Sequence, residues 1–255
     1  DRHAYDLERY AEAQQALERA LEIVPQEWGW TRAFSEYQMA RLHWVWGAWD
    51  AASDWLNRAL GAPDLPRRDE ATYRILGLLL AHRRGEEVGS WIEKLGELFD
   101  GQQGQAYGRF LLAKARILPD EAPVYLKEAL ALAQERDLPA LQISAHTLLA
   151  ETLLCRSGSS RGGLKEAQAH AQAAIKLLES YWPTGCSKLE VLWVHCCVQT
   201  ASLPADLSLI EQVLGYLMRI AENEVPSQHR SSFLSQNPLS QAILQAARSA
   251  GLSIL

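Results

Sequence analysis

The chain has no long apolar run, and this limits its relation to membranes. No stretch of its 255 residues approaches the roughly 20 consecutive apolar residues that a membrane-spanning helix needs. The opening residues also lack the basic, apolar and small-residue segments of a secretory signal, so no such signal is present in the residues given. We expect no membrane partner and a cytoplasmic location.

Basic residues are in deficit. The chain has 25 Lys and Arg against 31 Asp and Glu, which gives a formal charge of −6 and a pI near 5.7. Proteins that bind nucleic-acid phosphates usually carry a basic stripe. We therefore expect no nucleic-acid partner, although an isolated basic patch remains compatible with this composition.

Cysteines are few, and none forms a CxxC pair. Of the four, Cys196 and Cys197 are adjacent within the apolar segment LWVHCCV, and Cys155 and Cys186 stand apart. This usage predicts reduced, buried thiols that act as small hydrophobic residues. A zinc site that combines them with His195 has the wrong ligand spacing, so we expect no metal.

Sequence motifs for catalysis are also missing. There is no Walker-type GxxxxGK[ST], GxGxxG, HExxH, GxSxG or EF-hand loop. The seven histidines are scattered, although helix pairing could bring His146 near His170. We expect no catalytic residue, no cofactor and no enzymatic activity. An acid–base site built between helices remains an alternative that one sequence leaves open.

What the sequence does contain is a pattern of small and large apolar residues over 33–64. It predicts two amphipathic helices that are separated at Gly47. Small residues at Ala40, Ala52 and Ala59 allow the helices to approach closely, and Trp49 and Leu56 fill the space between them. A pair of this kind cannot bury its apolar face alone, so neighbouring pairs are needed.

This pattern resembles the tetratricopeptide repeat, a helix–turn–helix unit of about 34 residues. Tyr10–Pro25 matches Trp49–Asp64 at a constant offset of 39 residues, and 122–175 carries further clear copies. The copies at 69–99 and 187–225 are weaker. The resemblance implies an all-α superhelix of stacked helical hairpins. We expect one half repeat, about five repeats and a C-terminal capping helix.

The remaining boundaries follow from helical periodicity and from Gly and Pro positions. We predict a repeat domain at 1–225 and a capping segment of the same domain at 226–255, which closes the last repeat with a helix at Leu239–Ala250. A longer flexible loop is predicted at Arg156–Gly163. Because Tyr10–Pro25 lacks most of a partner helix, we expect the chain to be part of a longer protein.

In the tetratricopeptide family the first helix of each repeat lines a concave groove. By that pattern the groove-facing residues of the 33–64 repeat are Phe34, Tyr37, Arg41, Trp44 and Val45. The same positions of a later copy are Ser144, Thr147, Glu151, Leu154 and Cys155. Aromatic residues and arginine often dominate binding energy, so the first set is the predicted partner-binding site. The alternative is that the tryptophans here fill gaps between irregular repeats.

A second resemblance links EALALAQERDLPALQISAHTLLAETLL and the ending RSSFLSQNPLSQAIL to the sensor arm of bacterial signal-transduction ATPase regulators. It implies an upstream ATPase domain of the same polypeptide, of which these residues carry no motif. Our main hypothesis is a non-enzymatic regulatory module that binds a protein or peptide on its concave face. The alternative is a ligand-sensing arm that binds a small-molecule effector in the superhelix lumen.

Overall fold

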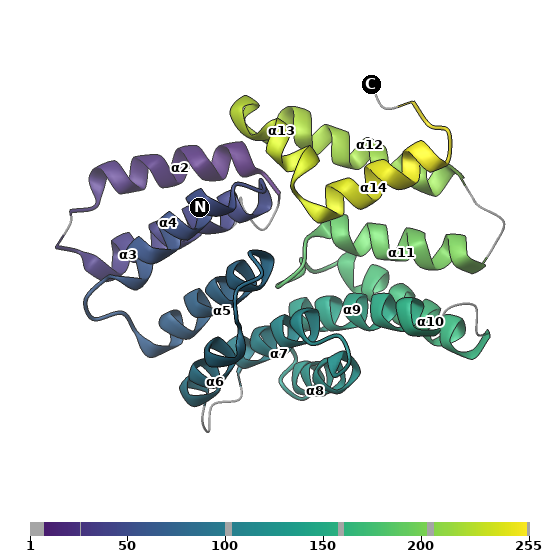
Figure 1. The fold of residues 1–255 in the computed structure, drawn as a ribbon, viewed down its shortest axis with the longest axis horizontal. Helices are drawn as coiled ribbons and strands as arrows, with labels where there is room; N and C mark the ends of the chain where they lie inside the picture. Colours follow the sequence, from purple (N-terminus) through teal and green to yellow (C-terminus); the bar gives the residue numbers. More distant parts are fainter. Residues whose placement is uncertain (1–7, 26, 100–103, 158–160, 203–206, 254–255) are drawn as a thin grey trace. The chain divides into compact units, whose positions relative to one another are not determined.

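The computed structural model describes residues 8–25, 27–99, 104–157, 161–202 and 207–253. In these ranges the chain is all-α, with thirteen helices and no strand (Figure 1). None of these helices is both long enough and apolar enough to cross a membrane. The helices are α2 (Tyr10–Ile23), α3 (Gly29–Val45), α4 (Trp49–Leu60), α5 (Arg67–Arg83), α6 (Gly89–Leu98), α7 (Gln105–Ile117), α8 (Ala122–Glu135), α9 (Pro139–Ser157), α10 (Arg161–Leu178), α11 (Lys188–Ser202), α12 (Leu207–Asn223), α13 (Ser227–Ser235) and α14 (Pro238–Ser249).

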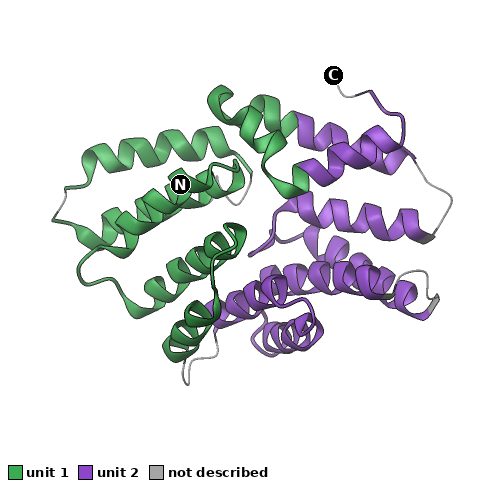
Figure 2. Cartoon of the chain, in the orientation of Figure 1, with its two compact units in different colours: residues 1–102, 219–240 green, residues 103–218, 241–255 purple. Residues whose placement is uncertain are grey.

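The chain divides into two compact units (Figure 2). The first unit comprises 1–102 and 219–240, and the second comprises 103–218 and 241–255. Helices α12 and α14 therefore contribute to both units, and α13 belongs with the N-terminal repeats. The sequence predicted that 226–255 forms a capping segment of one repeat domain, and this stays a prediction.

Within each unit, helices that follow one another in the chain pack against one another. In the first unit this holds from α2 to α6, and in the second from α7 to α11. Contacts also join alternate helices, namely α3 with α5, α7 with α9, and α9 with α11. This pattern is consistent with the helical repeat that the sequence predicted, because stacked hairpins place successive first helices side by side.

The core of the first unit confirms the predicted use of small residues. Ala40 on α3 and Ala52 and Ala59 on α4 are completely buried, and Leu56 is nearly so. They belong to one cluster with Tyr73, Leu76 and Leu80 of α5. Trp49 packs against this cluster while remaining partly exposed.

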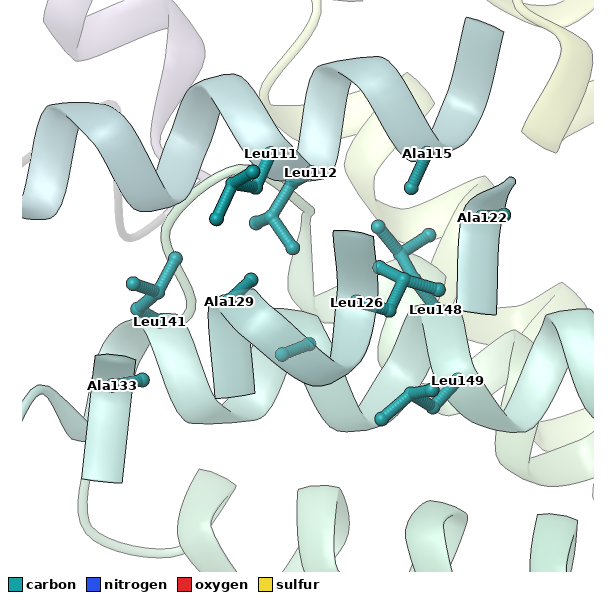
Figure 3. Packing of buried hydrophobic residues seen from close by; sticks show 11 residues of the cluster. Leu111, Leu112, Ala115, Ala122, Leu126, Ala129, Ala133, Leu141, Leu148 and Leu149 are labelled. Carbon is teal, nitrogen blue, oxygen red and sulfur yellow. The ribbon is translucent and has the colours of Figure 1, made fainter. Parts of the chain in front are cut away.

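The core of the second unit lies between α7, α8 and α9 (Figure 3). Leu126 and Ala129 of α8 and Leu141 of α9 are fully buried there. Gly108 allows α7 to approach α9, because a Cβ atom at this position would lie 2.3 Å from Leu141 Cδ2. The sequence analysis did not find this close approach.

The predicted turns between helices are partly confirmed. Gly47 and Gly85 adopt the left-handed conformation, with φ of +73° and +72°, and each follows a helix. The predicted loop at Arg156–Gly163 is wrong in its extent, because α9 continues to Ser157 and α10 begins at Arg161. Gly162 and Gly163 lie in the first turn of α10, where backbone N–H groups have no helical partner and glycine is tolerated. Residues 158–160 lie outside the described part of the chain.

Candidate functional surface

The five predicted groove residues all lie on α3, but they differ in exposure. Phe34 is 36% exposed, whereas Tyr37 is 8% exposed. Arg41, Trp44 and Val45 are half-buried. Steps of three and four residues do not stay on one line along a helix, so part of the set turns toward neighbouring helices. Phe34 is the most exposed of the five side chains.

Tyr37 belongs to the core rather than to an open groove. Its ring stacks on Tyr73 of α5, with centroids 4.1 Å apart and planes inclined by 14°. Both rings are buried, and burial raises the pKa of Tyr73 above its ordinary value. The Tyr73 hydroxyl has no hydrogen-bond partner among the described residues. Tyr37 therefore joins α3 to α5, and this packing leaves little of it for a partner to contact.

The other three predicted residues have structural contacts of their own. Arg41 Nη1 donates a hydrogen bond to Gln38 Oε1 at 2.8 Å. Trp44 packs against the core cluster of the first unit. The Val45 carbonyl oxygen accepts a hydrogen bond from Asn237 Nδ2 at 2.8 Å. The end of α3 is thus largely occupied by its own chain.

In the described part of the first unit, the exposed aromatic side chains lie at the beginning of α3. Trp28, Trp30 and Phe34, the aromatic patch, are 59%, 52% and 36% exposed. Trp30 and Phe34 lie one helical turn apart on one face, and Trp28 directly precedes the helix. The Trp30 Nε1–H donates to Asp69 Oδ2 of α5 at 2.8 Å, which orients the indole. The predicted groove began at Phe34, although the i, i+4 spacing of Trp30 and Phe34 would have added Trp30.

The charges beside the aromatic patch hold α3 to its neighbours. Arg32 Nη1 donates to the carbonyl oxygens of Leu21 at 3.1 Å and Val24 at 3.3 Å, at the end of α2. Arg32 Nε also lies 3.3 Å from Glu36 Oε1. Burial raises the pKa of Glu36, against the opposing effect of Arg32 and then Arg58. The charged side chains of Arg32 and Glu36 are thus engaged in contacts within the protein. The large side chains that remain exposed at the start of α3 are aromatic.

In the second unit, part of the corresponding face is covered by the chain itself. Ser144 and Thr147 of α9, predicted to face the groove, are almost completely buried. The connector between α10 and α11 lies over Ser144, whose Oγ donates to the Thr184 carbonyl oxygen at 2.7 Å. The Thr184 N–H donates to the Ala140 carbonyl oxygen at 3.1 Å, and Arg109 Nε donates to Thr184 Oγ1 at 2.7 Å. Nothing in the sequence predicted these contacts.

A cluster of charged side chains lies on α7, α9 and α11. Arg116 Nη2 of α7 lies 2.6 Å from Glu190 Oε1 of α11. Burial raises the pKa of Glu151 on α9, Glu190 raises it further, and Arg116 acts in the opposite direction. For Arg116 itself, burial lowers the pKa, but Glu190 and Glu151 outweigh it and the pKa is raised. Within the cluster, the positive charge of Arg116 is offset by Glu190 and Glu151, which indicates an ion-pair network between helices.

Two histidines of the second unit meet as the sequence suggested they could. The Nδ1 atoms of His146 on α9 and His170 on α10 are 2.8 Å apart. Burial, and next the charge of His170, lower the pKa of His146 to about 4. Burial also lowers the pKa of His170. One neutral ring donates to the other, so the pair joins the two helices of one hairpin without a charge.

The cysteines and the possible metal ligands were also predicted from the sequence. No disulfide joins the four cysteines; Cys196 is buried, but Cys155 is exposed, so the prediction of buried thiols is wrong for Cys155. Cys155 lies near the C-terminal end of α9. In the described ranges, no group of three or more His, Cys, Asp or Glu side chains is placed to hold a metal ion.

The second unit also contains a cavity of about 410 Å³ beside α11. It is lined by Trp193, Cys196, Cys197, Thr200, Ala201, Ile210 and Ala246. Burial raises the pKa of Cys197 to about 12, so its thiol is neutral at physiological pH. The Thr200 hydroxyl donates to the carbonyl oxygens of its own helix at Cys196 and Cys197. The lining is therefore largely apolar and uncharged.

Comparison with protein-family models, curated proteins and solved structures found no significant match to this chain.

Proposed function

We propose that this chain is a non-enzymatic interaction module of the tetratricopeptide type, and that it binds an extended protein segment at the aromatic patch. The observation that carries the proposal is the exposure of Trp30 and Phe34 on α3, whereas Tyr37 of the same helix and Trp46, which follows it, are buried. Exposed aromatic side chains on a rigid helix lose little conformational entropy on binding and supply large contact area. The chemistry favours a segment with apolar side chains.

Rigid support for the patch comes from both sides of α3. Arg32 ties the helix to the end of α2, and the Trp30–Asp69 hydrogen bond ties the indole to α5. A binding site whose side chains are fixed before the partner arrives needs less ordering on association. Trp44, in contrast, packs on the core, so a substitution there would lower stability together with any binding.

The test begins with selection of binding peptides from a random dodecapeptide display library on the immobilised chain. The dissociation constant of a selected peptide is then measured by fluorescence anisotropy for the wild type and for Trp30→Ala, Phe34→Ala and Ile23→Ala. Ile23 is the control, because it is 79% exposed but lies at the end of α2. We expect each aromatic substitution to weaken binding about 10- to 30-fold, which is a typical hot-spot effect of roughly 1.4–2 kcal/mol.

Two outcomes would contradict the proposal. One is that selected peptides bind Trp30→Ala and Phe34→Ala as tightly as the wild type. The other is that Ile23→Ala weakens binding equally, which would point to a general loss of apolar surface. Melting temperatures within about 2 °C of the wild type would show that the variants remain folded.

A second candidate function rests on the cavity beside α11. Its volume of about 410 Å³ lies in the range of small-molecule sites, and its lining suits a neutral, apolar ligand. This agrees with the resemblance to the sensor arm of ATPase regulators. Trp193 lines the cavity, so a ligand there should change the fluorescence of the wild type more than that of Trp193→Phe.

A further inference from the structure

Helix α13 lies on the turn between α3 and α4, within the first unit. Asn237 Nδ2 donates to the Val45 carbonyl oxygen across 192 residues of sequence. The same side chain accepts the Leu239 N–H at its Oδ1 at 2.9 Å, so it also caps the start of α14. At Gly47 a Cβ atom would lie 2.8 Å from Gln236 Cβ and 3.0 Å from the Ser232 carbonyl oxygen. The backbone of this turn and the end of α13 are therefore in close contact.

Three rings form the centre of this contact. The imidazole of His229 on α13 stacks on Trp46, with centroids 4.5 Å apart and planes inclined by 14°. It also meets the imidazole of His43 edge-on at 5.2 Å. Trp46 is completely buried and His43 is 9% exposed. His43, Trp46, His229 and Asn237 are called the latch below.

The latch contains two titratable rings and no acid that acts on them. Burial, and next the charge of His229, lower the pKa of His43 to about 4. Burial alone lowers the pKa of His229. His43 Nδ1 and Trp46 Nε1 have no hydrogen-bond partner among the described residues. A proton added to either ring would thus place a charge in an apolar contact without an anion.

The charged side chains near the latch are directed elsewhere. Arg230, next to His229, donates to the carbonyl oxygens of Val225 and Glu222. Arg41, two residues before His43, donates to Gln38. On the α4 side of the turn, Asp50 pairs with Arg84 at 3.1 Å. None of these groups shifts the pKa of either imidazole: that of His43 is lowered by burial and then by His229, and that of His229 by burial alone.

We infer that the latch is a proton-sensitive contact, which holds α13 on the α3–α4 turn at neutral pH and releases it in acid. Docking keeps both imidazoles neutral, whereas release exposes them to water, where they accept protons. Two imidazolium rings at 5.2 Å would also repel each other. The inference is independent of the aromatic patch, because it concerns the opposite end of α3.

The direction of the pH effect follows from linkage. The pKa of His43 is about 4 in the docked state and has its ordinary value of 6.5 when the ring is exposed. Docking is therefore fully favoured above pH 6.5 and weakens as the pH falls toward 4. At pH 5 the docking equilibrium should be weaker by about 30-fold through His43 alone. Stacking on Trp46 favours a charged His229 to a limited degree, so His43 carries most of the effect.

Hydrogen exchange measured by mass spectrometry tests the latch on the full chain. Protection factors, corrected for the intrinsic pH dependence of exchange, are compared from pH 7.5 to 4.5 for residues 227–237 and for α5. We expect 227–237 to lose at least 10-fold in protection in the wild type while α5 keeps its own. A His43→Phe/His229→Phe variant retains the rings without a titratable group, and its 227–237 segment should stay protected throughout.

Two further variants separate the latch from general acid sensitivity. Asn237→Ala removes the hydrogen bond to Val45 and should shift the loss of protection to higher pH. His82→Gln changes an exposed histidine at the end of α5 and should leave the profile unchanged. Constant protection of 227–237 in the wild type would overturn the inference. So would an equal acid response in the double phenylalanine variant, or loss of protection in α5 in the same step.

Discussion

Replacing Gly47 with alanine measures how tightly α13 is held on the α3–α4 turn, because a matched glycine lies elsewhere in the same unit. Gly47 and Gly85 have nearly identical φ, +73° and +72°, and each follows the end of a helix. An alanine at either position must adopt the left-handed conformation, which costs about 1 kcal/mol. The two positions differ only in what the new methyl group meets.

At Gly85 the methyl group meets no atom within 4 Å. At Gly47 it would meet Gln236 Cβ at 2.8 Å, the Ser232 carbonyl oxygen at 3.0 Å and the Asn237 nitrogen at 3.3 Å. Two of these three are backbone atoms, so a change of rotamer cannot relieve the contact. Overpacking of this kind typically costs about 1–3 kcal/mol. We expect Gly85→Ala to destabilise by about 1 kcal/mol and Gly47→Ala by about 2–4 kcal/mol.

Urea unfolding followed by circular dichroism gives the change in free energy of unfolding for each variant, provided that the slope of this free energy with urea concentration is the same in both. The informative quantity is the difference between them, because the conformational cost cancels. Equal destabilisation by the two substitutions would refute the close contact between Gly47 and α13. If the latch opens in acid, the same difference should also disappear at pH 4.5.

Three further predictions address the second unit. Leu126→Ala should cost about 2–5 kcal/mol because Leu126 is fully buried, while Val124→Ala, at a position 66% exposed, should change stability by less than about 0.5 kcal/mol; thermal or urea unfolding distinguishes them. His146→Leu should flatten the pH dependence of stability. The pKa of His146 is about 4 in the folded state against 6.5 in the unfolded state, so the residue contributes up to about 3 kcal/mol that is present above pH 6.5 and lost toward pH 4. An unchanged pH profile of stability in the variant would contradict this. Arg109→Met should raise hydrogen exchange in the α10–α11 connector, with a loss of about 1–3 kcal/mol that is not additive with Thr184→Val; additive losses would argue against their hydrogen bond.

Much of the fold was predictable because its information is local in the chain. Apolar residues at helical spacing predicted the helices of 33–64 and 122–175, and Gly47 marked the turn between α3 and α4. Small residues such as Ala52 and Ala59 predicted close helix packing, and both are completely buried. Each of these properties depends on residues within one hairpin, so a single sequence contains it.

The surface was predicted less well. The family pattern placed Tyr37 in a groove, but its ring stacks on Tyr73, which is a neighbour in space rather than in sequence. The predicted groove began at Phe34 and omitted Trp28 and Trp30, which are exposed, whereas Trp46 is buried. Exposure depends on which helix covers a side chain, and that is a property of the packed unit.

By itself, then, the sequence determined an all-α chain of helical hairpins with known turns, since periodicity and glycine positions act over a few residues. Only the tertiary structure decided that α13 lies on the α3–α4 turn, and that the α10–α11 connector covers Ser144. His43, an unremarkable histidine in the sequence, becomes a buried ring without an anion because His229 arrives from a distant segment. Contacts between distant segments depend on the shape and polarity of two complete surfaces, and no local pattern encodes them.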